Sequence, residues 1–246
     1  MSVGVHLLGR NLERDERSRA FKHSVEKIVR KRNVVHTLSM PHLDQGNIGS
    51  CEGNTAMEFL GTAKALRNRR AYWATKIGSR GKTSYPTERE AVEAYGLATT
   101  LDNDQIPGRY PPSDTGTSGL GIAKAMQQLG AIRNYNWTFT FEAFLATLQT
   151  RPIMLGTNWY QSMFEVTDAG FVHVQGSNAV GGHAYLAYAV DFTHERVGCT
   201  NHWRNEDGTL WGVKIGEHNG SFWICFNDLE RILIKEQGDS LVPVLM

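Results

Sequence analysis

Helix-like spacing of apolar residues marks the first large part of the chain, residues 41–150. In Thr55–Leu66, apolar residues recur three and four positions apart, as on one face of a helix; they are Ala56, Phe59, Leu60, Ala63 and Leu66. Three more helices are predicted from Ser and Thr residues, whose side-chain oxygens cap helix starts. The start signals are the capping box Thr87–Glu90, Ser118 before GLGIAKAMQQL, which Gly130 ends, and Thr140 before FEAFLATLQ.

Short apolar and alternating runs dominate residues 151–246 and predict strands. In HAYLAYAV, alternation puts His183, Tyr185, Ala187 and Ala189 on one face. The predicted strands are PIMLG, FVHV, HAYLAYAV, RVGCT, TLWGVKI, GSFWIC and LVPVL, with a short helix near Asp228–Leu233. The chain is therefore expected to be an α+β protein, with a helical lobe at 41–150 and a strand lobe at 151–246.

Residues 1–40 form a polar arm with a basic cluster. Lys27, Arg30, Lys31 and Arg32 indicate either a solvated arm or packing strap, or an anion-binding patch. A second basic stretch, Lys64–Lys82, surrounds Tyr72 and Trp73, a pattern that can grip single-stranded nucleic acid but also fits the solvated face of a helix. We favour the solvated face and expect no nucleic-acid partner, because the net charge is only +1. No apolar run reaches the roughly 18 residues of a membrane span.

The segment DQGNIGSCEGN, Asp44–Asn54, carries the first candidate chemistry. Cys51 lies at the predicted mouth of a helix, where unpaired N–H groups and the helix dipole favour a thiolate. Gln45, six residues earlier, offers an amide donor that can fold back toward a developing oxyanion. Together they suggest a nucleophile and half of an oxyanion hole.

A thiolate needs a base, and His183 is the strongest candidate among nine histidines. It follows Gly181 and Gly182 at the start of a predicted strand, where glycines let another backbone or a ligand come close. Downstream, Asn201 and Trp203 belong to CTNHW, which is followed by LWG and GSFWI.

These motifs together resemble the papain family of cysteine peptidases, over about residues 43–233. His183 and Asn201 follow Cys51 at the separations of about 130–150 residues typical of that family. The motifs LDQGNIGSC, DTGTSGLGIAKAMQQLG and GGHAY are closer to its bacterial and phage branch than to lysosomal cathepsins.

The resemblance implies a role for each matching residue. Cys51 is the expected nucleophile, His183 the general base and acid, Asn201 the residue that orients the imidazole, and Gln45 part of the oxyanion hole. Trp203 is expected to shield the His–Asn hydrogen bond. Supporting or substrate-binding positions are expected at Gly182, Asp114 and Gly119, with Asp114–Gly119 either binding peptide backbone or forming a plain surface loop.

The resemblance also implies a two-lobed fold, with a helical N-terminal lobe, an antiparallel β-barrel-like C-terminal lobe and the site in the cleft between them. The expected function is hydrolysis of peptide bonds through a thioester acyl-enzyme, with a peptide or protein substrate, no cofactor or metal, and a monomeric protein. Two alternatives stay open: a phage-type hydrolase of cell-wall peptides, and a catalytically silent binding or structural protein.

Three features depart from the family pattern. Glu52 follows the cysteine where plant and lysosomal members have an aromatic residue, and its charge would raise the pKa of the thiol unless it faces solvent or pairs with Arg67 or Arg70. His202 stands beside Asn201 and is the runner-up base. RNEDGTLWG inserts residues between the two tryptophan motifs.

The cysteine count bears on the compartment. Cys51, Cys199 and Cys225 do not make a disulfide framework, which indicates a reducing compartment. The opening residues are too charged and their apolar patch too short for a secretory signal. A cytoplasmic location is expected, or the host cytoplasm or virion if the protein is phage-encoded.

Overall fold

An antiparallel sheet of eight strands forms the frame of the computed structural model, which describes residues 8–12, 14–24, 31–62, 64–65, 85–176 and 178–245. In these residues the strand order is β2-β8-β3-β4-β5-β7-β6, with β1 paired to β4, so β2 and β6 end an open sheet. The strands are β1 Val34–Val35, β2 Asn134–Trp137, β3 Ile153–Trp159, β4 Gly181–Asp191, β5 Arg196–Thr200, β6 Val213–Ile215, β7 His218–Cys225 and β8 Asp239–Val244.

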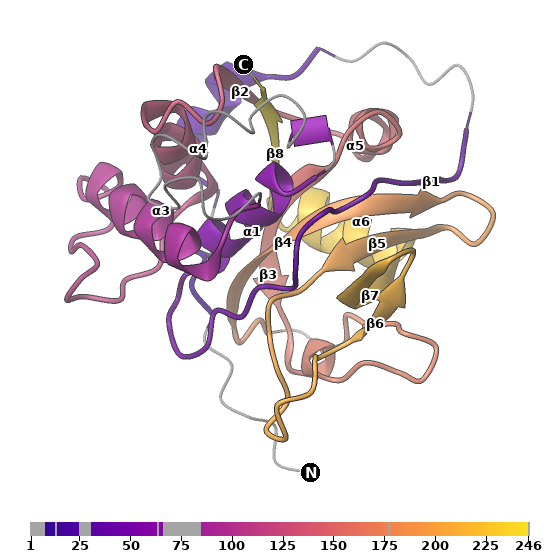
Figure 1. Ribbon diagram of the computed structural model, residues 1–246. Helices are drawn as coiled ribbons and strands as arrows, with labels where there is room; N and C mark the ends of the chain where they lie inside the picture. Colours follow the sequence, from indigo (N-terminus) through magenta and orange to yellow (C-terminus); the bar gives the residue numbers. More distant parts are fainter. Residues whose placement is uncertain are drawn as a thin grey trace.

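Three helices begin at the capping residues that the sequence predicted. Thr87 and Glu90 form the expected capping box, while Ser118 and Thr140 accept the N–H groups of Gly121 and Ala143. In Figure 1, α1, α3 and α4 gather on one side and β4–β7 on the other. The helices are α1 Cys51–Leu60, α3 Glu88–Leu101, α4 Gly119–Gln128, α5 Phe141–Leu148 and α6 Phe226–Glu230, with a π-helical turn Arg231–Lys235 and 3-10 turns Glu16–Phe21 and Gln161–Phe164.

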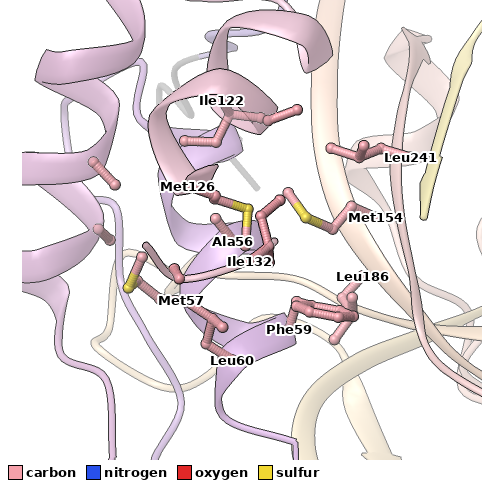
Figure 2. Packing of buried hydrophobic residues seen from close by; sticks show 14 of the residues in the cluster. Ala56, Met57, Phe59, Leu60, Ile122, Met126, Ile132, Met154, Leu186 and Leu241 are labelled. Carbon is pink, nitrogen blue, oxygen red and sulfur yellow. The ribbon is translucent and has the colours of Figure 1, made fainter. Parts of the chain in front are cut away.

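Two hydrophobic clusters lie on opposite faces of the central strands. In the first, side chains of α1 and α4 meet those of β3, β4 and β8, as Figure 2 shows for Phe59, Met126, Met154, Leu186 and Leu241. The second cluster packs α5 and α6 against the other face of the same strands. The α1 helix therefore rests directly on the strand that begins with Gly181 and carries His183.

Alternation along β4 holds only to Ala187. Tyr185 and Ala187 enter the second cluster, but Ala189 enters the first, so the prediction that Ala189 shares their face is wrong. The register with β5 shifts between Ala187 and Ala189. Such a bulge adds one residue on one strand and reverses the faces beyond it.

The sheet takes strands from all three predicted parts of the chain. β1 comes from the N-terminal arm and β2 from the helical part of the chain, yet both pair with strands of the sheet. FVHV forms no strand, since only Phe171 makes an isolated bridge, and within TLWGVKI only Val213–Ile215 is a strand. Local alternation is a weak guide where glycines and turn residues interrupt a run.

Several predictions concern residues that the structure does not describe. Residues 27, 30, 67 and 70, and most of the basic and aromatic stretch 64–82, lie outside the described residues. Within the described ranges, no helix combines the length and apolar character that a membrane span requires. The three cysteines are all free thiols.

Candidate active site

Cys51 is the first residue of α1, four residues earlier than the apolar pattern indicated. Its side chain is completely buried. The turn before it is tied down by Asp114, whose Oδ2 accepts the Gly49 N–H at 2.8 Å, and whose Oδ1 accepts the Tyr95 hydroxyl at 2.5 Å. Tyr95 itself is buried in α3. Two helices and a connecting loop thus fix the start of α1.

His183 lies near the start of β4 and contacts Asn201, which follows β5. Nε2 of His183 is 3.0 Å from Oδ1 of Asn201, and the same Oδ1 accepts the His202 N–H at 2.9 Å. Because that oxygen is an acceptor, Nε2 carries the proton of a neutral ring and Nδ1 is the basic nitrogen. Both side chains are fully buried.

Aromatic rings enclose this pair. Trp203 stacks on His183 with ring centroids 4.3 Å apart, and Trp159 meets the same imidazole edge-on at 4.9 Å. Both indoles are buried. The inserted residues after Trp203 form a turn that brings Trp211 back to it. The backbone N–H of Trp211 donates to the Trp203 carbonyl at 3.2 Å. A dry aromatic wall strengthens the His–Asn hydrogen bond by excluding water.

Gln45 is held against this wall. Its Oε1 accepts the indole N–H of Trp203 at 3.1 Å, its Nε2 donates to the Ile48 carbonyl at 2.8 Å, and its backbone N–H donates to the His202 carbonyl at 3.0 Å. The amide orientation is therefore fixed, with the nitrogen turned toward the Ile48 turn that leads to Cys51.

The sulfur of Cys51 lies beside β4 and is covered. Backbone groups of Ala184, which follows His183, and of Gly9 in the N-terminal segment act to lower the pKa of its thiol. Burial raises the pKa of Cys51 to about 12, with the charge of Glu52 adding to the rise. We expected the helix start to lower this pKa; in the covered arrangement desolvation outweighs it.

Glu52 does not face solvent, and its expected partners Arg67 and Arg70 lie outside the described residues. It is buried, and its pKa is raised well above the usual range by burial and by Asp239, against the lowering effect of Arg10. Among the described residues, the arginine that lowers this pKa is Arg10, from the N-terminal arm of the chain.

His202 is a poor candidate base. It is fully buried, which lowers its pKa to about 3, and its Nδ1 lies 3.6 Å from Oε1 of Glu58. Glu58 is also buried, accepts the Thr200 hydroxyl at 2.5 Å, and has a pKa raised by burial. The two side chains form a polar cluster behind Asn201 rather than a second proton acceptor for Cys51.

The supporting positions divide into two groups. Gly182 does admit another backbone, since its carbonyl accepts the Arg10 N–H at 3.0 Å and a Cβ on it would lie 2.4 Å from the Arg10 oxygen. Gly119 begins α4 beside Asp239. Asp114 accepts hydrogen bonds from Gly49 and Tyr95, so its described contacts are with the turn before Cys51 and with α3.

Comparison with known proteins defines the fold. No protein-family model matches the chain, and no curated protein sequence matches it. The solved structure of xylellain, a cysteine protease from Xylella fastidiosa, is similar, with a TM-score of 0.56 and 19% identity over 97% of this chain and 96% of that chain. Digestive procathepsin L 3 of Tenebrio molitor larval midgut gives 0.51 and 13% over 96% and 76%. The chain has the α+β papain-like fold.

Three buried residues near the site were not singled out from the sequence: Arg10, Glu58 and Asp239. A fourth, Trp159, lies in the aromatic-rich stretch Asn158–Phe164, which the sequence offers either as a pocket lining or as aromatic core. Glu58 falls on the polar side of the predicted helix Thr55–Leu66, so the apolar spacing gives no signal that it is buried. Nothing local marks Arg10 or Asp239, which lie near opposite ends of the chain.

Proposed function

We propose that the protein is a cysteine peptidase that hydrolyses peptide bonds through Cys51, His183 and Asn201. The observation that carries the proposal is the 3.0 Å contact between Nε2 of His183 and Oδ1 of Asn201. Because that oxygen is an acceptor, Nδ1 of His183 is left as the base, on a strand against which the helix that begins with Cys51 packs. A buried, oriented imidazole is what a thiol nucleophile requires as its base.

In the proposed mechanism, the thiol proton passes to Nδ1 of His183 while Sγ attacks the carbonyl carbon. The oxyanion accepts hydrogen bonds from the Gln45 amide and the backbone N–H of Cys51. As the C–N bond breaks, the imidazolium gives its proton to the leaving amine, and a thioester remains on Cys51. His183 then deprotonates a water molecule, which hydrolyses the thioester and regenerates the thiol.

The proposal is tested by incubating the full chain with a mixed peptide library and sequencing the products by mass spectrometry. The wild-type protein is expected to cleave, and Cys51→Ala to lose at least about a thousandfold in rate with its fold unchanged. Cys225→Ala, which removes a half-buried thiol of β7, is the matched control and is expected to keep full activity. Cleavage that persists in Cys51→Ala would overturn the proposal.

The same assay separates the alternatives. Comparing purified peptidoglycan with casein distinguishes a cell-wall peptide hydrolase from a general peptidase. A silent scaffold would leave both substrates and the whole library intact. We propose a peptide or protein substrate for a monomeric enzyme, and casein cleavage that exceeds peptidoglycan release is the expected result.

A further inference from the structure

Glu58 is an acidic residue buried within the helix that carries the nucleophile. It lies in α1, about two helical turns after Cys51, and its side chain is only 1% exposed. A carboxylate in such a place is costly unless polar partners surround it. The groups around Glu58 therefore show what its charge is placed to hold.

Thr200 is the residue to which Glu58 is hydrogen-bonded. The Thr200 hydroxyl donates to Oε2 of Glu58 at 2.5 Å, and the same hydroxyl oxygen accepts the N–H of Leu186 at 3.2 Å. Leu186 lies in β4, the strand of His183, and Thr200 is the last residue of β5. One hydroxyl thus joins the nucleophile helix to the two strands that position His183 and Asn201.

The residue on the other side of Asn201 also faces Glu58. Nδ1 of His202 lies 3.6 Å from Oε1 of Glu58, and the backbone N–H of His202 donates to Oδ1 of Asn201 at 2.9 Å. That oxygen is the one that lies 3.0 Å from Nε2 of His183. The two oxygens of one carboxylate therefore face both chain neighbours of Asn201. We call residues 200–202 the Asn201 segment.

Two further imidazoles contribute to the surroundings of Glu58. The charges of His218, in β7, and of His42, in the chain before the nucleophile turn, lower the pKa of Glu58, whereas burial raises it. Their two rings lie 6.3 Å apart, centroid to centroid. With His202, three imidazoles from separate parts of the chain surround the carboxylate, and a positive charge on any of them favours its ionised form.

Apolar packing alone does not set the position of α1 along the sheet. The first hydrophobic cluster holds α1 against β4 through side chains such as Phe59 and Leu186 (Figure 2). Such contacts are non-directional. A hydrogen bond to an ionised group is directional and about twice as strong as one between neutral groups. This matters because a shift of about 1 Å between nucleophile and base can cost about a hundredfold in rate.

We propose that Glu58 is a positioning residue, whose carboxylate ties the helix that begins with Cys51 to the Asn201 segment. It thereby sets where Asn201 holds the imidazole of His183, without itself touching the reacting atoms. The inference rests on the proposed peptidase function for its kinetic readout. A merely structural role predicts instead that loss of Glu58 lowers stability and leaves kcat of the folded enzyme unchanged.

The first test removes the hydrogen bond from each side in turn. Thr200→Val keeps the shape of the side chain and loses the hydroxyl, whereas Glu58→Leu loses the carboxylate. In each folded variant, kcat for a cleaved peptide is expected to fall at least about tenfold, with KM within about twofold of wild type. A wild-type kcat in either folded variant would overturn the proposal.

Conservative replacements and a control separate positioning from loss of stability. Thr200→Ser keeps a hydroxyl and Glu58→Gln keeps an acceptor oxygen, so both are expected to retain kcat within about threefold of wild type. Thr147→Val removes another buried hydroxyl, which donates to the Ala143 carbonyl at 2.8 Å in α5, and is expected to lower stability with kcat unchanged. An equal fall of kcat in Thr147→Val, or no recovery in Thr200→Ser and Glu58→Gln, would contradict positioning.

A second readout needs no turnover. The Nε2 proton of His183 is observed by NMR in the isotope-labelled full-length protein, and its exchange with water reports the hydrogen bond to Asn201. Exchange is expected to be at least about tenfold faster in Thr200→Val and Glu58→Leu, and unchanged in Thr147→Val. Unchanged exchange in the first two variants would overturn the proposal.

The two readouts also separate this inference from the proposed function. Faster exchange of the His183 proton in the variants, with no peptide cleaved by wild type, would support positioning and overturn the peptidase. Cleavage by wild type, with exchange and kcat unchanged in Thr200→Val, would do the reverse. With neither cleavage nor faster exchange, both proposals would be wrong.

Discussion

His183 and Asn201 are joined by a 3.0 Å contact between Nε2 and Oδ1, beneath the stacked ring of Trp203. His183 lies near the start of the long central strand β4, and Asn201 directly follows the neighbouring strand β5. The antiparallel pairing of β4 with β5 therefore brings the two side chains together.

Removing the Asn201 amide is expected to lower kcat/KM by about a hundredfold, because the imidazole loses the acceptor that fixes its tautomer. Asn201→Ala tests this by peptide hydrolysis over pH 5–9. The exposed Asn205, which bonds Thr209, supplies the matched control Asn205→Ala. Equal activity of the two variants would show that the contact has no part in turnover.

The indole N–H of Trp203 is expected to act by holding Gln45. Trp203→Phe keeps a ring on His183 but loses the bond to Gln45 Oε1, so kcat is expected to fall about tenfold with KM little changed. Trp211→Phe removes a comparable bond, from its indole to the Phe164 carbonyl, within the same aromatic cluster. An equal loss in both variants would point to general packing instead.

Asp114 is expected to support the turn before Cys51. Asp114→Ala should lower the free energy of unfolding by about 1–3 kcal/mol and reduce kcat at constant KM, because the Gly49 N–H and the Tyr95 hydroxyl lose their acceptor. Asp104→Ala, on the surface near Arg17, is the control. A raised KM with unchanged stability would restore the peptide-binding role that the loop sequence also allowed.

Burial of His202 is expected to make the protein acid-sensitive. Its pKa is lowered to about 3 in the folded state but is about 6.5 in an unfolded chain, so the unfolded state binds the proton first. Stability should be fully present above pH 6.5 and fall by about 1.4 kcal/mol per pH unit toward pH 3. His202→Gln should remove this component of the slope.

Urea unfolding measures the free energy of unfolding of Cys51→Ala and of Cys51→Ala with His202→Gln added. The Cys51→Ala background excludes self-digestion. The gap in stability between them should change with pH only below about 6.5. A constant gap from pH 4 to 8 would show that His202 has the same pKa in both states.

Sequence reasoning succeeded where the determinants are local. The caps at Thr87, Ser118 and Thr140 depend on side chains within a few residues of the groups they bond. The motifs around Cys51 and His183 can be identified in the sequence because each pairs an unusual residue with neighbouring glycines, and the catalytic roles of the two residues stay predictions. The turn that returns Trp211 to Trp203 is likewise made by neighbouring residues.

Contacts between residues far apart in the sequence could not be predicted. Arg10 and Asp239 are 229 residues apart, and neither has a neighbour that signals the other. Nor does any local pattern show that Cys51 is completely buried, although this burial raises the pKa of its thiol. The bulge in β4 that moved Ala189 to the other face depends on its pairing with β5.

The most direct test of the central claim is to trap the acyl-enzyme. Wild-type protein is mixed with a peptide ester, quenched in acid within milliseconds to seconds, and examined by intact mass and peptide mapping. A thioester on Cys51 that decays as product forms is expected in the wild-type protein, and no such adduct is expected in Cys51→Ala. Product formation with no adduct on Cys51, or with an adduct on Cys199 or Cys225, would contradict it.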